Sequence, residues 1–205
     1  MEKSNIQRKD NFLSAEECEY ISWILNADEQ WSYISIPSPS VKFAEWFTTL
    51  QYKRYSSHAL QRLSMQIYRK TQDFVNKGGD SQLHLSAMFA GVREVDTVAP
   101  LTPVGSYFSP MSTVAIVWLG GHTTSESVYL SLNGNKVEVR PGGIIAYQPE
   151  RLTDVLKVPA MNQNFIISSW STNELSTELT QQLDKMKSYL DACCNEEQPV
   201  VKPQE

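Results

Sequence analysis

The stretch that decides the fold runs from Met111 to Trp170 and contains six short segments: TVAIVWL at 113–119, SVYLSL at 127–132, NKVEVR at 135–140, GGIIAY at 142–147, TDVLKV at 153–158 and FIISSW at 165–170. Short apolar or alternating segments separated by glycine, proline and asparagine are typical of β-strands. The first segment, 113–119, is apolar on both of its faces. It is therefore predicted to be a central strand that is covered on both sides.

A hairpin is predicted around Asn133 and Gly134, because a type I′ turn needs positive φ at two successive residues and these two residue types tolerate it. A two-residue loop then sets the pairing of the flanking strands: Leu132 with Asn135, Leu130 with Val137 and Val128 with Val139. In this register the apolar side chains share one face of the hairpin and the polar side chains share the other. The turn and the hydrophobic pattern thus agree on one register.

Helical patterns lie on both sides of these strands. Ser14 and Glu17 have the spacing of a capping box and predict a helix start there. A second helix is expected over 57–76, followed by a strand over 83–92 with Leu83, Leu85, Ala87 and Phe89 on one face. A strand is also expected over 31–36. The pattern over 41–55 is compatible with a short helix followed by a strand, but it does not decide between the two element types. A last helix, with Thr172 and Asn173 as capping candidates, carries a stripe at helical spacing: Leu175, Leu179, Leu183, Met186 and Leu190.

This order of elements predicts an α+β fold, mainly β, with a jelly-roll or double-stranded β-helix core. N-terminal supporting helices and a C-terminal amphipathic helix complete it. We expect one domain over 1–194, followed by a disordered polar tail over 195–205. Within that domain we expect helical support over 12–80, the strand core over 83–170 and the last helix over 173–193.

Composition excludes several classes of function. The chain has 205 residues, a net charge of -5 and a pI near 5.3, which argues against a nucleic-acid partner. No apolar run approaches the about 20 residues of a membrane span. No signal peptide is apparent, so a cytoplasmic location is predicted. The three cysteines, Cys18, Cys193 and Cys194, have no metal-binding spacing and suggest no disulfide framework.

The order of parts resembles the prolyl-4-hydroxylase-like branch of the iron(II)/2-oxoglutarate oxygenases. The similar segments are FLSAEECEYI near the N-terminus, then VAIVWLGG, VEVRPGGIIAYQPERLTDVLKV and FIISSW. The resemblance covers about residues 11–171. It lies in the order of strands and turns, without an invariant signature. It implies a double-stranded β-helix, in which His-x-Asp/Glu and a distant His hold iron. It also implies a basic residue on the closing strand that binds the cosubstrate carboxylate.

When the family's motif is aligned with this chain, most of the aligned positions do not hold a metal-binding residue of the family. The first motif falls at Glu94-Val95-Asp96, and the second histidine falls at Thr153. No Arg or Lys stands at 162–164 or early in FIISSW, where the basic residue is expected. The chain contains no His-x-Asp or His-x-Glu at all, and its three histidines are His58, His84 and His122. We therefore expect Glu94, Asp96 and Thr153 to be vestigial, with no catalytic residue, no metal ligand and no cofactor.

Three functions remain open. The first is a catalytically degenerate binding or assembly protein, with a protein partner or self-association through Leu175, Leu179, Leu183, Met186 and Leu190 of the last helix. The second is an active dioxygenase, a hydroxylase that binds Fe(II) and 2-oxoglutarate through non-standard ligands. Glu94, Asp96 and Asp154 would suit a hard cation such as Mg²⁺ or Mn²⁺ better than Fe²⁺. The third is an unrelated ligand-binding jelly roll.

Overall fold

The computed structural model describes residues 6–27, 41–46, 58–77, 79, 81–93, 99–100, 111–121, 128–132, 135–149, 155–156 and 163–196. Its helices are α1 (Ala15–Ala27), α3 (His58–Val75) and α4 (Thr177–Glu196). Its strands are β1 (Gln7–Lys9), β2 (Val41–Glu45), β3 (His84–Arg93), β4 (Ala99–Pro100), β5 (Thr113–Gly121), β6 (Val128–Leu132), β7 (Asn135–Val139), β8 (Ile144–Tyr147), β9 (Val155–Leu156) and β10 (Gln163–Ser171).

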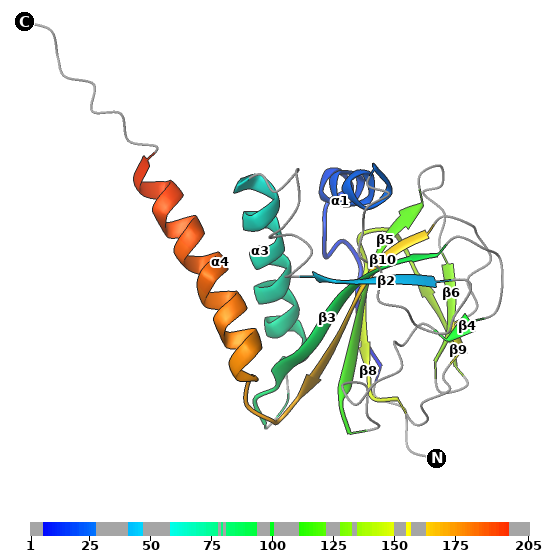
Figure 1. The fold of residues 1–205 in the computed structure, drawn as a ribbon. Coiled ribbons are helices and arrows are strands. Elements are labelled where there is room, and N and C mark those ends of the chain that lie inside the picture. Colours follow the sequence, from blue (N-terminus) through cyan, green and yellow to red (C-terminus); the bar gives the residue numbers. More distant parts are fainter. Residues whose placement is uncertain are drawn as a thin grey trace, which may run out of the picture.

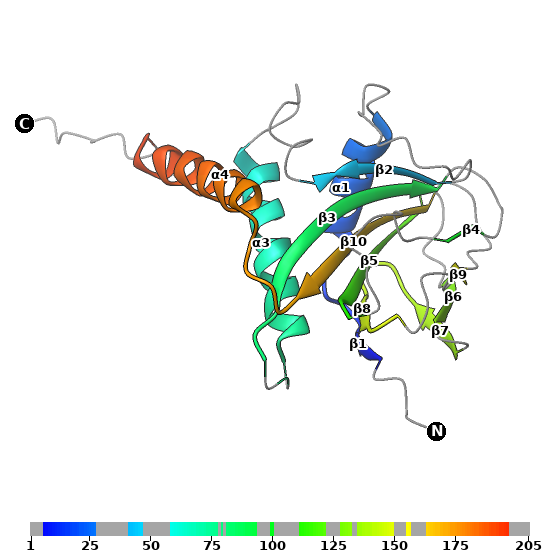
Figure 2. The ribbon, with the colours of Figure 1, turned by 60° about the horizontal axis from the view of Figure 1, so that its bottom comes forward.

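The strands form one large antiparallel sheet and two small pairs. The large sheet has the order β1-β8-β5-β10-β3-β2, and the pairs are β4-β9 and β6-β7. Figures 1 and 2 show the three helices gathered apart from the two small pairs, with the large sheet between them. One apolar cluster joins the helices to one face of the sheet, and a second joins the other face to the β6-β7 hairpin. The predicted fold class, an α+β jelly roll that is mainly β, is confirmed.

Strand β5 has the central position that its sequence predicted. It pairs with β8 on one side and with β10 on the other. Ala115, Val117 and Leu119 join the helix-side cluster, while Ile116 and Trp118 join the hairpin-side cluster. The strand is therefore buried on both faces, as an all-apolar segment requires.

The hairpin register is also confirmed. Leu132 pairs with Asn135, Leu130 with Val137 and Val128 with Val139. On the apolar face Leu130 is fully buried, whereas Tyr129 on the opposite face is 43% exposed. Lys136 lies over the Tyr129 ring at 4.1 Å from its centroid. Asn133 and Gly134 themselves lie outside the described residues.

Helix α1 begins at the predicted capping box. The Ser14 N–H donates to Glu17 Oε2 at 2.8 Å, and the Glu17 N–H donates to Ser14 Oγ at 3.1 Å. The apolar side chains of Cys18, Ile21, Ile24 and Leu25 are buried and belong to the helix-side cluster. These two bonds satisfy two of the N–H groups that a helix start leaves without a partner.

Replacing Ser14 with alanine should lower the free energy of unfolding by about 1 kcal/mol, because the Glu17 N–H loses its acceptor. Urea denaturation followed by far-UV circular dichroism measures this change. Glu17→Gln is the matched control, since its amide oxygen can still accept from the Ser14 N–H. An equal loss in both variants would mean that the negative charge of Glu17 stabilises this helix start as much as the Ser14 Oγ acceptor does.

The C-terminal helix starts later than predicted. Ser176 is the capping residue, since its Oγ accepts from the Leu179 N–H at 3.2 Å, so the prediction of Thr172 or Asn173 as the cap is wrong. The helix also runs through Glu196, and the disordered tail predicted from 195 is wrong for its first two residues. The helix packs against α3. The rest of that tail lies outside the described residues.

The strand predicted over 83–92 is confirmed as β3, but its apolar side chains do not all lie on one face as predicted. A bulge interrupts its pairing with β10, so that Ser169 pairs with Ala87 and Trp170 with Leu85. Leu85 therefore joins the helix-side cluster, whereas Ala87 and Phe89 face the hairpin. The extra residue at a bulge shifts the alternation, which a strictly period-two pattern cannot anticipate.

Other expectations are tested only in part. In the ambiguous stretch 41–55, the structure places a strand first, β2, while 47–55 and the strand expected over 31–36 lie outside the described residues. Ala99 and Pro100 form the two-residue strand β4, which was not expected from the sequence. Among the helices that the structure describes, none is long and apolar enough to cross a membrane. The single-domain organisation and the cytoplasmic location stay predictions.

Candidate functional site

The candidate site is the face of the large sheet that looks toward the β6-β7 hairpin. Its side chains come from four neighbouring strands and from the hairpin, and they are nearly all apolar: Ala87, Phe89, Val114, Ile116, Trp118, Leu130, Leu132, Val139, Ile145, Tyr147, Phe165 and Ile167. In a double-stranded β-helix this face lines the inside of the barrel. The described part of that interior is thus built as an apolar wall.

Two aromatic rings dominate this wall. Trp118 of β5 and Phe165 of β10 are paired in the sheet, and their rings stack at 5.7 Å between centroids with 3° between the planes. Both side chains are fully buried. The Phe165 ring also covers Gly91 of β3 so closely that a Cβ on Gly91 would overlap the ring. Gly91 is therefore a glycine because the ring needs its place.

The closing strand β10 bears on the binding of a carboxylate. Phe165 and Ile167 are its inward side chains, and Ile166 and Trp170 belong to the helix side. No residue of Gln163–Ser171 is basic. A 2-oxoglutarate carboxylate would gain most from a guanidinium or ammonium at such a position, and this strand offers none.

Two buried polar groups were missed by the sequence reasoning. The Trp118 indole N–H and both amide atoms of Asn164 have no hydrogen-bond partner among the described residues, although both side chains are fully buried. Asn164 directly precedes Phe165 in β10, and the pairing of β10 with β5 shifts its register between these two residues. An asparagine in the otherwise apolar run NFII was the signal that could have marked this position.

The predicted metal positions Glu94, Asp96 and Thr153 lie outside the described residues, as does Asp154. The strands that follow them are described: Ala99 pairs with Leu156 and Pro100 with Val155, in antiparallel order. The chain therefore enters β4 and β9 at opposite ends of this pair.

The histidines offer no alternative metal centre in the part of the chain that the structure describes. His84 is the first residue of β3, pairs with Ser171 and is partly buried. His58 is the first residue of α3, and His122 lies outside the described residues. Among described side chains, no group of three or more His, Cys, Asp or Glu could hold a metal ion.

Cys18 is not a nucleophile. Its side chain is buried between α1 and the sheet. Burial, together with the nearby carboxylates of Glu17 and Glu19, raises the pKa of the Cys18 thiol to about 12. The thiolate, which is the reactive form, is thus absent at neutral pH.

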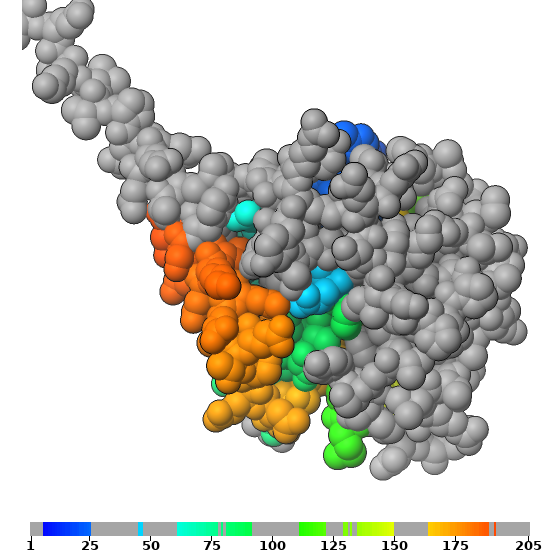
Figure 3. All heavy atoms as spheres, in the orientation of Figure 1, coloured from blue at the N-terminus to red at the C-terminus, as the bar shows by residue number. Residues whose placement is uncertain are grey.

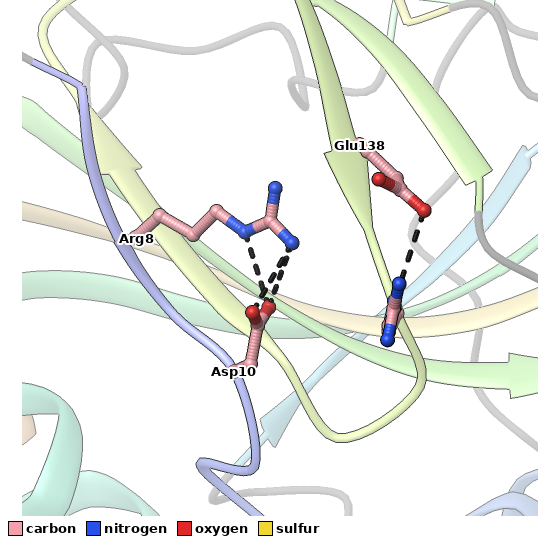
Figure 4. Close-up of polar contacts among 4 residues, drawn as sticks. Arg8, Asp10 and Glu138 are labelled. Atoms are coloured by element: carbon pink, nitrogen blue, oxygen red, sulfur yellow. Dashed lines mark hydrogen bonds and ion pairs between the residues drawn. The ribbon is translucent and has the colours of Figure 1, made fainter.

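The ion pairs near the hairpin lie on the surface and form no site. Arg8 donates to Asp10 Oδ1 at 2.9 Å, and Arg140 Nε lies 3.7 Å from Glu138 Oε1. Figure 4 shows Arg8 pointing toward Asp10. The Arg140 side chain is 66% exposed. Exposed pairs of this kind contribute at most about 1 kcal/mol.

Comparison with solved structures finds a shared fold at low sequence identity. HygX from Streptomyces hygroscopicus, with nickel, 2-oxoglutarate and hygromycin B bound, has a TM-score of 0.54 at 11% identity, over 82% of this chain and 83% of that chain. The viral collagen prolyl hydroxylase vCPH from Paramecium Bursaria Chlorella virus-1 has a TM-score of 0.51 at 14% identity, over 80% of this chain and 94% of that chain.

The epimerase SnoN from nogalamycin biosynthesis, described as non-heme and alpha-ketoglutarate dependent, has a TM-score of 0.54 at 9% identity, over 82% of this chain and 78% of that chain. No protein-family model matches this sequence, and no curated protein matches it. The likeness thus lies in the fold.

These comparisons contradict one prediction from the sequence, namely that no cofactor is expected. HygX is seen with nickel and 2-oxoglutarate, and vCPH is seen as a 2-oxoglutarate complex. Proteins that share this fold are thus seen with these groups bound, and the expectation of no cofactor finds no support in the fold. The resemblance read from the sequence is confirmed at the level of the fold: this chain has the double-stranded β-helix of the iron(II)/2-oxoglutarate oxygenase superfamily.

Proposed function

We propose that this protein is a binding component built on the oxygenase fold, which keeps a ligand-binding barrel but does not carry out oxidation by histidine-bound iron. The observation that carries the proposal is the inward face of β10. It presents Phe165 and Ile167, packed against Trp118, where an oxygenase needs a cation for its cosubstrate. In this protein the side chains at this position pack in the apolar core.

The distribution of histidines supports the same proposal. Two imidazoles and one carboxylate on one face of iron leave positions open for cosubstrate and oxygen. The chain lacks His-x-Asp and His-x-Glu, and two of its three histidines begin elements, α3 and β3. The residues present do not fit the iron-binding set of the fold, so we derive no oxidation step through iron.

We propose that the protein has lost oxidative turnover but still binds a metal and 2-oxoglutarate. The solved neighbours hold a metal and 2-oxoglutarate, and carboxylates remain in this chain at Glu94, Asp96 and Asp154. Carboxylate oxygens are the ligands of hard cations. A metal bound through them would be Mg²⁺ or Mn²⁺ in preference to Fe²⁺.

The second candidate is an active dioxygenase with non-standard ligands. The fold comparisons favour it, because the neighbours with the same fold include a prolyl hydroxylase and an alpha-ketoglutarate-dependent epimerase. The same comparisons count against the third reading, an unrelated jelly roll. Measuring turnover separates the first two candidates.

The deciding experiment measures binding and turnover in the same sample. We expect Mn²⁺ to raise the melting temperature, with about 2.7 kcal/mol of stabilisation at 100 times its dissociation constant. We also expect no succinate to form when Fe²⁺, oxygen and 2-oxoglutarate are supplied. Succinate formation above a protein-free control would establish the active dioxygenase instead, and the absence of any metal-dependent shift would refute metal binding in the barrel.

Single carboxylate variants locate the metal. Asp96→Asn and Asp154→Asn should each reduce the Mn²⁺-dependent shift, because an amide is a weaker ligand for a hard cation. Glu178→Gln is the matched control, since Glu178 is an exposed carboxylate in the first turn of α4. An equal reduction in all three variants would indicate nonspecific binding to an acidic protein.

A further inference from the structure

Strand β8 is buried on both faces, and β1 covers its outer edge. Its four residues, Ile144–Tyr147, are each at most 3% exposed. One edge of β8 pairs with β5 and the other with β1, and Figure 2 shows β1 beside β8 at the end of the large sheet. Without β1, a fully buried strand would present a free backbone edge in the described part of the sheet. Edges of this kind pair readily with another chain.

Strand β1 is itself poorly suited to further pairing. It has three residues, Gln7–Lys9, and no strand that the structure describes pairs with its outer edge. Helix α4 forms another side of the molecule (Figure 3) and lies apart from β1 in Figure 2, so it does not shield this edge. Arg8, Lys9 and Asp10 are exposed. Short length and charged side chains, lysine above all, are the features by which edge strands resist pairing with another chain.

The attachment of β1 rests on its backbone. Ile6, just before the strand, packs against the hairpin-side cluster, and Phe12, after it, belongs to the helix-side cluster. The Phe12 N–H also donates to the Gly142 carbonyl at 2.7 Å. Between these two anchors the side chains of Arg8 and Lys9 are exposed. Pairing of the backbone with β8 therefore holds this part of the chain in place.

The direction of each backbone group in β8 follows from one hydrogen bond at its start. The Trp118 N–H donates to the Gly143 carbonyl at 2.9 Å, so this carbonyl points toward β5. Successive residues of an antiparallel strand turn their N–H and C=O groups to opposite sides. The N–H and C=O groups of Ile144 and Ala146 therefore point toward β1, and those of Ile145 point toward β5.

The pairing register then fixes the directions in β1. Lys9 pairs with Ile144, and Gln7 pairs with Ala146. The N–H groups of Gln7 and Lys9 consequently face β8, whereas the N–H group of Arg8 faces the outer edge. Two neighbouring residues of β1 thus differ in whether their N–H contributes to the pairing.

We propose that β1 is a protective strand, which occupies the edge of β8 and so keeps it from pairing with the β8 edge of a second copy. The partner follows from the symmetry of that edge. The outward groups of Ile144 and Ala146 lie on either side of Ile145, so two β8 edges in antiparallel order about a two-fold axis at Ile145 would satisfy each other. The inference is independent of what the barrel binds.

Two proline variants of the full chain test the release of the edge. Lys9→Pro removes an N–H that faces β8, whereas Arg8→Pro removes one that faces outward, which an edge strand tolerates. Each variant also removes one positive charge, so the pair is matched. Hydrogen exchange followed by NMR should show the Ile144 amide exchanging about tenfold faster in Lys9→Pro, the factor for about one lost net hydrogen bond. Arg8→Pro should exchange like the wild type.

Sedimentation velocity over a wide concentration range tests the protection itself. Lys9→Pro should associate with an apparent dissociation constant about tenfold below that of the wild type, because the freed groups of β8 gain partners in a second copy. An excess of a peptide of residues 5–10 should reverse this association, and Arg8→Pro should behave as the wild type. Ser14→Ala, which weakens the nearby helix start but leaves the N–H groups of β1 in place, should also behave as the wild type.

Gln7→Pro is a second releasing variant, since its N–H also faces β8, and it carries the same test if Lys9→Pro fails to fold. Faster exchange without association would overturn the proposal, because the open edge would then need no protection. Equal association of Arg8→Pro would assign the effect to charge, and association that the peptide does not reverse would assign it to another surface. Unchanged exchange in both releasing variants would show that β1 does not hold the edge of β8.

Discussion

Replacing Trp118 with alanine should lower the free energy of unfolding by about 3–5 kcal/mol, the range for a buried large aromatic side chain. Trp118 is fully buried and stacks on Phe165, whose ring in turn covers Gly91. Removing the indole leaves a cavity that this chain of contacts cannot close, because the three residues lie on three paired strands. Guanidinium denaturation followed by circular dichroism measures the loss.

Trp118→Phe is the control that separates packing from hydrogen bonding. The phenyl ring can keep the stack on Phe165, and the indole N–H that it removes has no partner among the described residues. We expect a cost of about 1 kcal/mol, because the change removes volume but leaves no other group without its bond. A loss as large as that of alanine would mean that the indole N–H binds something inside the barrel.

The barrel was predictable because two of its local signals are strong. Asn133 and Gly134 select a tight turn, and the apolar residues on either side then accept one register. Thr113–Leu119 has no polar face to expose, so it can only be central. In both cases the physical constraint lies within a few neighbouring residues, where a sequence records it directly.

Predictions failed where tertiary contacts replaced local ones. The stripe from Leu175 suggested that the last helix begins near Thr172, yet Leu175 packs on the core before the helix starts at Ser176. The bulge in β3 opposite Ser169 and Trp170 is a second example, since it appears only in the pairing with β10. Neither event leaves a mark in the local pattern of apolar residues.

The site was less predictable than the fold. Strand alternation in NFIISSW separates two faces, but it cannot say which face is the inside of a barrel. The structure assigns Phe165 and Ile167 to that inside. The resemblance in the order of strands and turns predicted the fold, although no family model matches this sequence. It could not predict which residues act in place of the missing histidines, because the order of strands and turns does not identify metal ligands.

Replacing Gly142 with alanine should cost about 2–4 kcal/mol, the sum of a left-handed backbone and a steric conflict. Gly142 has φ of +80°, and a Cβ there would lie 2.5 Å from the Leu13 carbonyl oxygen. That segment cannot move away easily, because the Phe12 and Leu13 N–H groups both donate to the Gly142 carbonyl, at 2.7 and 2.9 Å. The Gly142 N–H donates to the Trp118 carbonyl at 2.7 Å, so one turn joins the start of α1 to the central strand.

Two comparison variants separate the two parts of this cost in the same denaturation experiment. Gly79→Ala should change stability by less than about 0.5 kcal/mol, because its Cβ would meet the Ser81 carbonyl oxygen at an ordinary 3.7 Å and its φ is not left-handed. Gly142→Asn tolerates positive φ but still places a Cβ against Leu13. We therefore expect Gly142→Asn to remain destabilised, though by less than alanine. Full stability in that variant would show that the approach of Leu13 is not a constraint, and that only the backbone conformation requires glycine at this turn.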